Sequence, residues 1–232
     1  MNPAIIYHFI QGPLVWLSLA TFISGIIFQT WRLSKMMQPS LNDRRIPEKE
    51  LPSLTVMSKK ERFIRRLFFL KNSILGVNPL VAFISLIFHL CLLLTPVFVP
   101  AHAVLLEKFS GLGWISWFSW SPQTVHFTTG LILACGFFFV VRRMMIRRVR
   151  AITTAYDYLM LALALTPFLT GYMAHANMGD YRLMIMLHIL SGELMLILIP
   201  FSKFFHMIFF FFSRFAIVNE YSLGAPKRSW QF

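Results

Sequence analysis

The sequence predicts an all-α integral membrane protein, a bundle of five membrane-spanning helices. Of its 232 residues, 57% are hydrophobic and only 13% are charged, whereas soluble domains contain about one quarter charged residues. Five apolar runs are long enough for membrane helices, which need about 20 residues to cross the hydrocarbon core. Most basic residues lie in short stretches between these runs, as they do in the cytoplasmic loops of membrane proteins.

The first apolar run covers about residues 5–31. It has no basic leader and is too long for the apolar part of a signal peptide, so we expect a retained helix. The other predicted spans are residues 79–99, 124–141, 156–173 and 183–212. The fifth is the longest and is expected to tilt or to project beyond the membrane. We expect the whole chain, residues 1–232, to form a single membrane domain.

Residues 32–78, between the first two runs, are predicted to form a cytoplasmic loop. Its first part contains Pro39, Pro47 and Pro52 and is expected to be irregular. Residues 59–69 are basic and amphipathic. This pattern predicts a helix that lies on anionic lipid headgroups or docks a cytoplasmic partner subunit, and both can hold.

The distribution of Lys and Arg predicts the orientation of the chain. Twenty of the 22 lie in residues 32–78, 142–150 and 203–232, and only Lys108 and Arg182 lie on the opposite side. The N-terminus is therefore expected outside and the C-terminus in the cytoplasm, in the cell (inner) membrane of a bacterium or archaeon. Because this asymmetry accounts for the net charge of +13, we expect no nucleic-acid partner.

The two cysteines, Cys91 and Cys135, both lie inside apolar runs and form no CxxCH or four-cysteine motif. This excludes covalently attached c-type haem and argues against an iron–sulfur cluster within the chain. Both cysteines are expected to be small core residues.

Histidines are costly inside a membrane, so their spacing is informative. His188 and His206 are eighteen residues apart in the predicted fifth helix. In one continuous helix this separation is five whole turns, so both would face one direction, about 27 Å apart along the axis. The fifth span would then carry two ligands on one face, at two depths of the membrane.

The antiparallel second span carries His89 in its inner half and His102 at its outer end. If the second and fifth spans face each other, His89 pairs with His206 and His102 pairs with His188. Haem iron accepts two imidazole nitrogens, and bundle interiors hold such cofactors. Gly192, one turn from His188, would leave room for a flat macrocycle or would serve close helix packing.

Residues 188–193, His-Ile-Leu-Ser-Gly-Glu, and residues 200–206, Pro-Phe-Ser-Lys-Phe-Phe-His, resemble the gamma subunit of respiratory nitrate reductases. The resemblance extends to related cytochrome b subunits of anaerobic respiratory complexes, including those of sulfate-reducing bacteria. It covers most of the chain in topology and is specific over the fifth span. It implies two b haems, the inner one on His89 and His206 and the outer one on His102 and His188.

The second span departs from the nitrate reductase pattern, in which the two histidines stand closer together. Thirteen residues separate His89 from His102, with Pro96 and Pro100 between them. In a regular helix this is about 220° of rotation, so the prolines must kink or end the helix for His102 to reach the outer haem. Alternatively, His126 or His175 replaces His102, or the outer haem is absent.

A quinone site is predicted near the outer surface, with His126, His175, Lys108 and Glu193 as candidates. Histidine can hydrogen-bond a quinone oxygen and take up a proton near neutral pH. Alternatively, the interfacial histidines reach toward water or bind haem propionates. Glu193 is the only acidic residue well inside a span, which favours a proton relay or a partner that orients a ligand histidine over a structural hydrogen bond.

The leading hypothesis is a membrane cytochrome b subunit of an anaerobic respiratory complex. The resemblance implies two b haems as cofactors, and a quinone, expected to be menaquinone, as substrate. The expected partners are a cytoplasmic iron–sulfur subunit and other subunits of a membrane redox complex. The chain would be the quinol-oxidising or quinone-reducing subunit of that oxidoreductase. The alternatives are a haem-free anchor or assembly subunit and a transporter, although no inverted repeat supports the latter.

Overall fold

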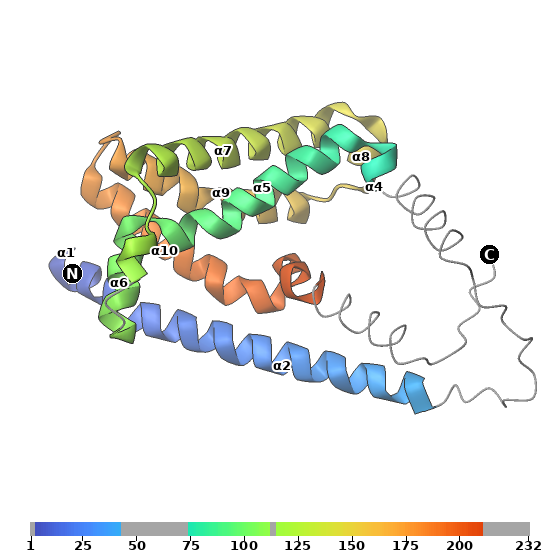
Figure 1. Ribbon diagram of the computed structural model, residues 1–232, viewed down its shortest axis with the longest axis horizontal. Coiled ribbons are helices and arrows are strands. Elements are labelled where there is room, and N and C mark those ends of the chain that lie inside the picture. Colours follow the sequence, from blue (N-terminus) through green and yellow to red (C-terminus); the bar gives the residue numbers. More distant parts are fainter. Residues whose placement is uncertain (1–2, 43–73, 112–114, 211–232) are drawn as a thin grey trace, which may run out of the picture. The chain divides into compact units, whose positions relative to one another are not determined.

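The structure is a computed structural model that describes residues 3–42, 74–111 and 115–210 (Figure 1). All regular elements in these ranges are helices. Five of them are long and apolar enough to cross a membrane, which confirms the predicted number of spans. Their bounds are Ile5–Lys35, Pro79–Phe98, Pro122–Met145, Ala155–His175 and Tyr181–Phe201. The chain divides into two compact units, residues 60–192 and residues 1–59 with 193–232, and we describe each in turn.

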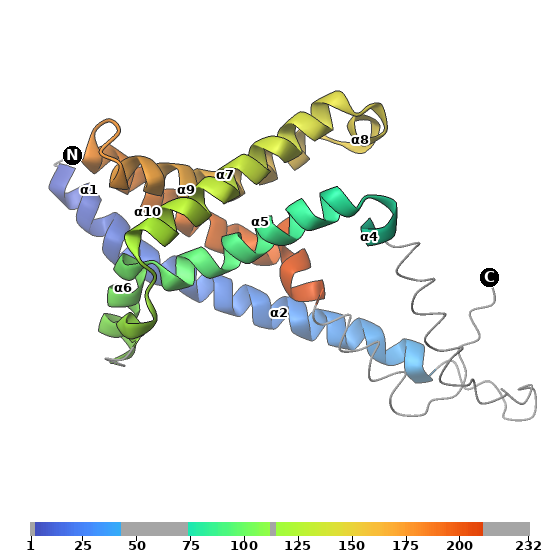
Figure 2. The same cartoon turned by 45° about the horizontal axis from the view of Figure 1, so that its top comes forward.

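Three spans form the frame of the unit of residues 60–192. Helices α5 (Pro79–Phe98), α7 (Pro122–Met145) and α9 (Ala155–His175) lie with α7 next to both of the others (Figures 1 and 2). Helices α5 and α7 begin with a proline, and α9 begins just after Thr154. Proline in the first turn and threonine just before it both favour the start of a helix. Apolar residues then run the length of each helix, as hydrocarbon requires.

The core of this unit consists of four buried side chains, Phe88, Ile132, Leu161 and Phe168. Close packing of α7 on α9 depends on Gly136, because a Cβ atom there would lie 2.5 Å from Leu165 Cδ1. Small residues at helix contacts are typical of membrane proteins. Both cysteines, Cys91 and Cys135, are unpaired and pack against this core, as expected for small core residues.

The second span ends where the prolines predict. Helix α5 stops at Phe98, Val99 is extended, and a separate helix, α6, covers Pro100–Ser110. The residue before a proline is driven out of the helical region, while proline itself is favoured at the first helical position. The structure therefore confirms that the prolines end the helix, and His102 belongs to α6 and not to α5.

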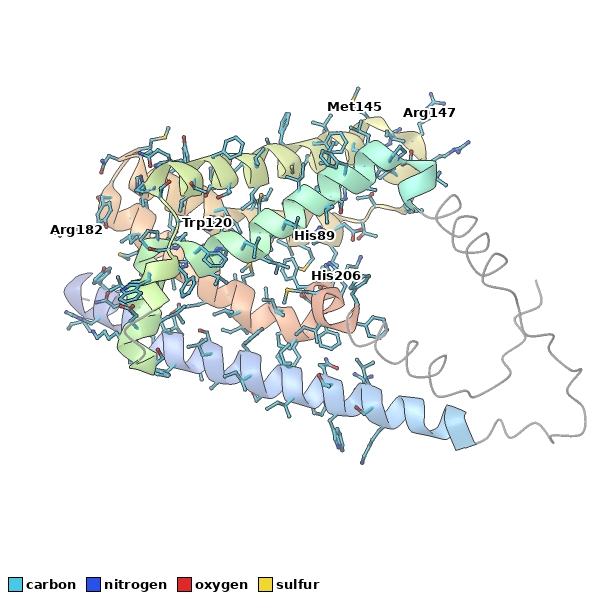
Figure 3. All side chains as sticks on the ribbon, in the orientation of Figure 1. His89, Trp120, Met145, Arg147, Arg182 and His206 are labelled. Carbon is cyan, nitrogen blue, oxygen red and sulfur yellow. The ribbon has the colours of Figure 1, made fainter. Side chains whose placement is uncertain are left out.

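The segment between α6 and α7 folds back onto the end of α5. The Trp120 N–H donates to the Phe98 carbonyl at 2.8 Å, and the two rings stack with centroids 5.0 Å apart (Figure 3). Glu107 accepts a hydrogen bond of 2.7 Å from the Ser116 N–H, which lowers the pKa of the Glu107 carboxyl below its usual value. These contacts hold α6 at the end of the second span.

The other unit contains the first span. It begins as α1 (Pro3–Phe9), passes through a π-helical turn (η1, Ile10–Leu14) and continues as α2 (Val15–Asn42). The π turn contains Pro13, and such turns accommodate a proline that cannot join the regular hydrogen-bond ladder. The expectation of irregular structure from residue 32 onward is wrong up to Asn42, where α2 is still helical. The basic segment 59–69 lies outside the described residues.

The fifth span is interrupted, which corrects the predicted continuous helix over residues 183–212. Helix α10 covers Tyr181–Leu198, and two short 3-10 turns follow, Ile199–Phe201 (η4) and Lys203–Phe205 (η5). Pro200 removes one backbone donor, and the extended Ser202 caps the second turn by accepting the Phe204 N–H at 3.2 Å. The five-turn calculation that placed His188 and His206 on one face therefore does not hold.

The interruption also joins the fifth span to the first. Phe204 N donates to Ser202 Oγ, and the Pro200 carbonyl accepts a hydrogen bond of 3.0 Å from the side chain of Gln29 on α2. Gly25, one turn earlier on α2, permits this approach, since a Cβ atom there would lie 2.6 Å from Pro200 Cγ. The break is thus packed against α2.

Candidate functional site

The four histidines predicted to bind haem share one hydrogen-bond pattern: each Nδ1 bonds a backbone carbonyl oxygen. The acceptors are Ser85 for His89 (2.7 Å), Pro96 for His102 (2.8 Å), Pro167 for His188 (2.8 Å) and Lys203 for His206 (2.6 Å). A carbonyl oxygen only accepts, so Nδ1 must carry the proton, and in a neutral ring Nε2 then carries the lone pair. Histidines that bind a metal usually have this tautomer, with the N–H of the other ring nitrogen bonded to an acceptor in the same way.

His102 on α6 and His188 on α10 form a close pair. Their ring centroids are 5.8 Å apart and their planes differ by 24°. Bonds between a metal and imidazole nitrogen are about 2 Å long, so rings on opposite sides of one metal ion have centroids roughly 6 Å apart. The structure therefore brings together the two residues predicted for the outer haem, at a spacing that suits one metal ion between them.

The prolines of the second span position His102 as well as ending the helix. In a continuous helix the Pro96 carbonyl would accept the N–H of residue 100. Pro100 has no N–H, and the Pro96 carbonyl instead accepts the proton on His102 Nδ1. Pro100 lies four residues after the acceptor Pro96 and two residues before His102. This spacing is thus a pattern in the sequence that indicates a histidine whose Nδ1 is held by a backbone carbonyl.

His188 is positioned by α9, through two residues that the sequence did not single out. Its Nδ1 donates to the Pro167 carbonyl of that helix. Gly171, one turn further along α9, leaves room for the ring, because a Cβ atom there would lie 2.9 Å from His188 Nδ1 and 3.0 Å from Cε1. Only glycine fits this approach without moving the imidazole.

The Gly171→Ala substitution tests this support. The added methyl group is expected to displace the His188 ring and weaken its bond to Pro167. If the His102–His188 pair binds haem iron as predicted, its affinity for haem should fall about tenfold to a hundredfold. Haem retention during purification and titration of haem into the depleted protein measure this effect. Gly130→Ala is the matched control, since a Cβ atom at Gly130 meets no heavy atom within 4 Å. Equal retention in both variants would contradict the role of Gly171.

His89 and His206, the predicted inner pair, belong to different units of the structure. Their pairing stays a prediction. His89 lies near the middle of α5, with the Phe88 ring edge-on to its own at a centroid distance of 5.4 Å. His206 follows directly on the last 3-10 turn of the fifth span.

His126 and His175 form a second pair, of a different kind. His126 Nε2 and His175 Nδ1 are 2.8 Å apart, so one ring donates a hydrogen bond to the other. The ring centroids are 4.2 Å apart and nearly perpendicular, and Tyr172 packs edge-on to His126 at 5.3 Å. These two quinone-site candidates come together between the start of α7 and the end of α9, while His102 contacts His188. The arrangement favours His102 over either as the outer ligand.

The other two quinone-site candidates do not join this pair by any described contact. Lys108 is exposed near the end of α6. Glu193 lies five residues beyond His188 on α10, is only 5% exposed, and has both carboxylate oxygens buried without a hydrogen-bond partner among the described residues. An unpaired buried carboxyl is unusual and marks a functional residue more often than a structural one.

A metal site built by side chains alone is not visible in the described part of the chain, where no group of three or more His, Cys, Asp or Glu converges. Haem iron needs only two protein ligands, because the macrocycle supplies the other four. Paired histidines therefore suit haem better than a bare ion such as Zn²⁺, which binds three or four side chains.

These features define a helical, multi-pass membrane protein with histidine pairs. The chain is similar to a protein of Nitratidesulfovibrio vulgaris (strain Hildenborough) whose curated name is simply "Protein", with 28% identity over 226 residues that cover 94% of each chain. No protein-family model matches the chain, and no solved structure matches it. The similarity therefore extends over nearly the full length of both chains and is not confined to one segment.

Proposed function

We propose that the chain is a membrane cytochrome b subunit that carries electrons across the bilayer on two b haems. The observation that carries this proposal is the His102–His188 pair, with ring centroids 5.8 Å apart and each Nδ1 held by a proline carbonyl. Two membrane histidines with this geometry and this tautomer form a ligand set that fits haem iron. The His126–His175 pair differs, because its two rings bond each other directly and leave no room for a metal ion between these nitrogens.

The residues of this site would bind and orient the cofactor. Haem, when bound, supplies a centre that accepts and releases one electron. His102 and His188 would hold the iron through Nε2, while the Pro96 and Pro167 carbonyls fix the orientation of the rings and raise the basicity of the ligands. An added Cβ atom at Gly192 would meet no heavy atom within 4 Å, so the helix surface one turn from His188 leaves space for a flat macrocycle.

The second haem would be held by His89 and His206, toward the cytoplasmic side. The support is the resemblance over residues 200–206 and the carbonyl bonds to Nδ1 of both residues. Electrons would pass between the two haems and a cytoplasmic iron–sulfur subunit of the same respiratory complex. Neither the contacts nor the sequence favour one direction of flow.

The outer partner in this proposal is a quinone, expected to be menaquinone, that exchanges electrons and protons near the His126–His175 pair. In the neutral pair one imidazole nitrogen outside the mutual hydrogen bond still carries a lone pair. The pair can therefore take one proton and keep its hydrogen bond, which becomes charge-assisted and stronger. A second proton would remove the acceptor and place two like charges together. The pair thus suits the uptake of one proton from a quinol.

Reduction of the purified, oxidised protein by a menaquinol analogue tests this function. We expect the b-type absorbance to rise when the quinol is added. His126→Ala and His175→Ala should each lower the rate of this reduction by roughly a hundredfold, which is the usual contribution of a general base. Reduction by dithionite, which needs no quinone site, controls for intact haem. Quinol-driven rates that stay unchanged in both variants would contradict a quinone site at this pair.

A further inference from the structure

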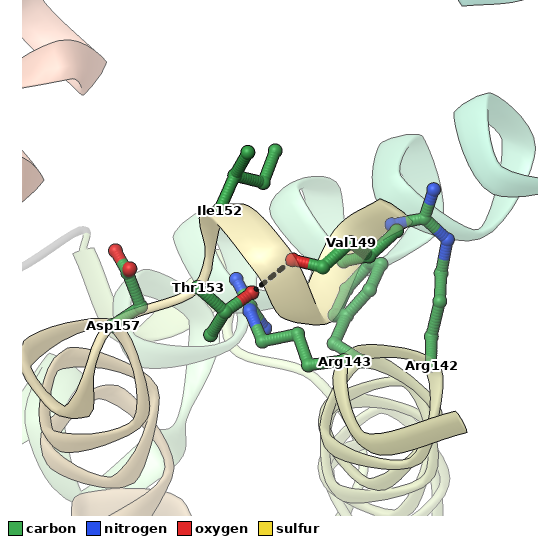
Figure 4. A pocket seen from close by; sticks show the side chains of 7 residues that line it. Arg142, Arg143, Val149, Ile152, Thr153 and Asp157 are labelled. Carbon is green, nitrogen blue, oxygen red and sulfur yellow. Dashed lines mark hydrogen bonds between the residues drawn. The ribbon is translucent and has the colours of Figure 1, made fainter. Parts of the chain in front are cut away.

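The corner between α7 and α9 carries a cleft that the electron-transfer proposal does not use. Helix α7 ends at Met145, the short helix α8 (Arg147–Ile152) follows, and α9 begins at Ala155. The cleft has a volume of about 300 Å³ (Figure 4). Its lining combines two arginines with apolar and polar side chains, namely Phe139, Arg142, Arg143, Val149, Ile152, Thr153 and Asp157.

Local hydrogen bonds shape this corner. Ile146 and Thr153, on either side of α8, are both extended. Thr153 Oγ1 donates to the Val149 carbonyl at 2.7 Å (Figure 4), and Asp157 Oδ2 accepts the Thr154 N–H at 2.8 Å at the start of α9. Both arginines of the cleft lie in the last turn of α7, and the one carboxylate in the lining already caps a helix.

One arginine of the cleft has a buried N–H without an acceptor. Arg142 Nε is buried without a hydrogen-bond partner in the described part of the chain, and Arg143 lines the same cleft. Burying an N–H group without an acceptor is costly, and native proteins rarely do so. A site for an anion with several oxygens is the simplest explanation, because the N–H fork of a guanidinium group matches pairs of phosphate or carboxylate oxygens.

The position of the cleft favours a lipid. It lies at the end of the span Pro122–Met145, next to exposed apolar side chains, Met144, Met145, Ile146 and Ile152. Met145 and Arg147 mark this end of the unit in Figure 3, opposite Arg182. A basic pocket with apolar walls between the ends of membrane helices suits a phosphate headgroup above acyl chains.

We infer that this cleft binds the phosphate of an anionic phospholipid, through Arg142 and Arg143. Phe139, Val149 and Ile152 would contact the glycerol and the upper acyl chains. The site is independent of haem and of the histidine pairs. It differs from general attraction of basic loops to membranes because two specific arginines, and not their equally charged neighbours, hold the headgroup.

Native mass spectrometry of the full-length protein in detergent tests this inference, with titration of phosphatidylglycerol and of phosphatidylcholine. We expect the wild type to prefer phosphatidylglycerol. The double variant Arg142→Gln, Arg143→Gln should bind it roughly tenfold to thirtyfold more weakly, since each basic group near a membrane surface contributes about a factor of five. Its affinity for phosphatidylcholine should change little.

The matched control is Arg147→Gln with Arg148→Gln. This pair removes the same charge from the same corner, but both residues are exposed and neither lines the cleft. It should keep the preference for phosphatidylglycerol. Equal weakening in both double variants would show diffuse attraction and overturn the inference, as would equal binding of the two lipids by the wild type.

Two further measurements complete the test. Inorganic phosphate at millimolar concentration should not displace the lipid; if it does, the cleft is a site for free phosphate and the lipid assignment is wrong.

If the glutamine variant does not fold, Arg142→Lys with Arg143→Lys keeps both charges and loses the paired N–H fork. This variant should bind phosphatidylglycerol several-fold more weakly, and unchanged binding would overturn the inference.

Discussion

Replacing His102 or His188 with alanine is expected to remove one of two b haems from the protein. In the proposed site each substitution would delete one of the two histidines that hold the iron, and the remaining imidazole should bind too weakly to retain the cofactor through purification. Because both residues would hold the same iron, the two variants should lose the same component of the reduced-minus-oxidised spectrum. The haem content, measured as the pyridine haemochrome, should fall from two to one per chain in each.

His126→Ala is the matched control for this experiment. It removes an imidazole from the same unit, yet His126 is bonded to His175 and not to the predicted iron ligands. It should keep two haems. Loss of a haem in His126→Ala with retention in His102→Ala would contradict the ligand assignment and would restore His126 as the outer ligand.

The second large effect is expected at the predicted inner site. His89→Ala and His206→Ala should each remove the other haem and leave the component held by His102 and His188. Although the two residues are far apart in the sequence and belong to different units, loss of one and the same spectral component in both would establish their pairing. Electron exchange between quinone and the proposed iron–sulfur partner, in whichever direction it runs, should also stop in both variants.

Different components lost in the two variants would contradict the inner pair. A useful comparison is His8→Ala, in the first helix, which removes a histidine that we assign to neither haem. That variant is expected to retain both components and to transfer electrons at the wild-type rate.

The sequence was sufficient to predict the five spans, because hydrophobicity over about 20 residues is a strong signal in a membrane protein. It also predicted that Pro96 and Pro100 would end or kink the second span, and the structure ends it at Phe98. Proline restricts its own backbone and that of the preceding residue, so its effect is local and can be predicted from a short segment.

The fifth span shows where periodicity fails. The calculation that aligned His188 with His206 assumed an unbroken helix, but the chain leaves the helix after Leu198 and is extended at Ser202. A single proline near a helix end can be tolerated, and at the break the Pro200 carbonyl accepts a hydrogen bond from Gln29, which is far away in the sequence. Contacts of that kind cannot be inferred from the local sequence.

The sequence singled out the histidines of the candidate site but not the groups that support them. Spacing and resemblance singled out the four histidines, whereas Gly171 and the Pro167 carbonyl became visible only when α9 was placed beside α10. The contact between His126 and His175 likewise joins two helices whose register the sequence does not give. In the sequence Arg142 is only one member of a basic run. The structure shows in addition that its Nε–H is buried without a hydrogen-bond partner among the described residues.

The most direct test of the central claim is the haem content of the wild-type protein purified from membranes of a host that makes b haem. The proposal predicts a b-type reduced-minus-oxidised spectrum and two haems per chain. A monodisperse, helical protein with no b-type absorbance, even after incubation with haem, would contradict it and would favour a haem-free membrane anchor.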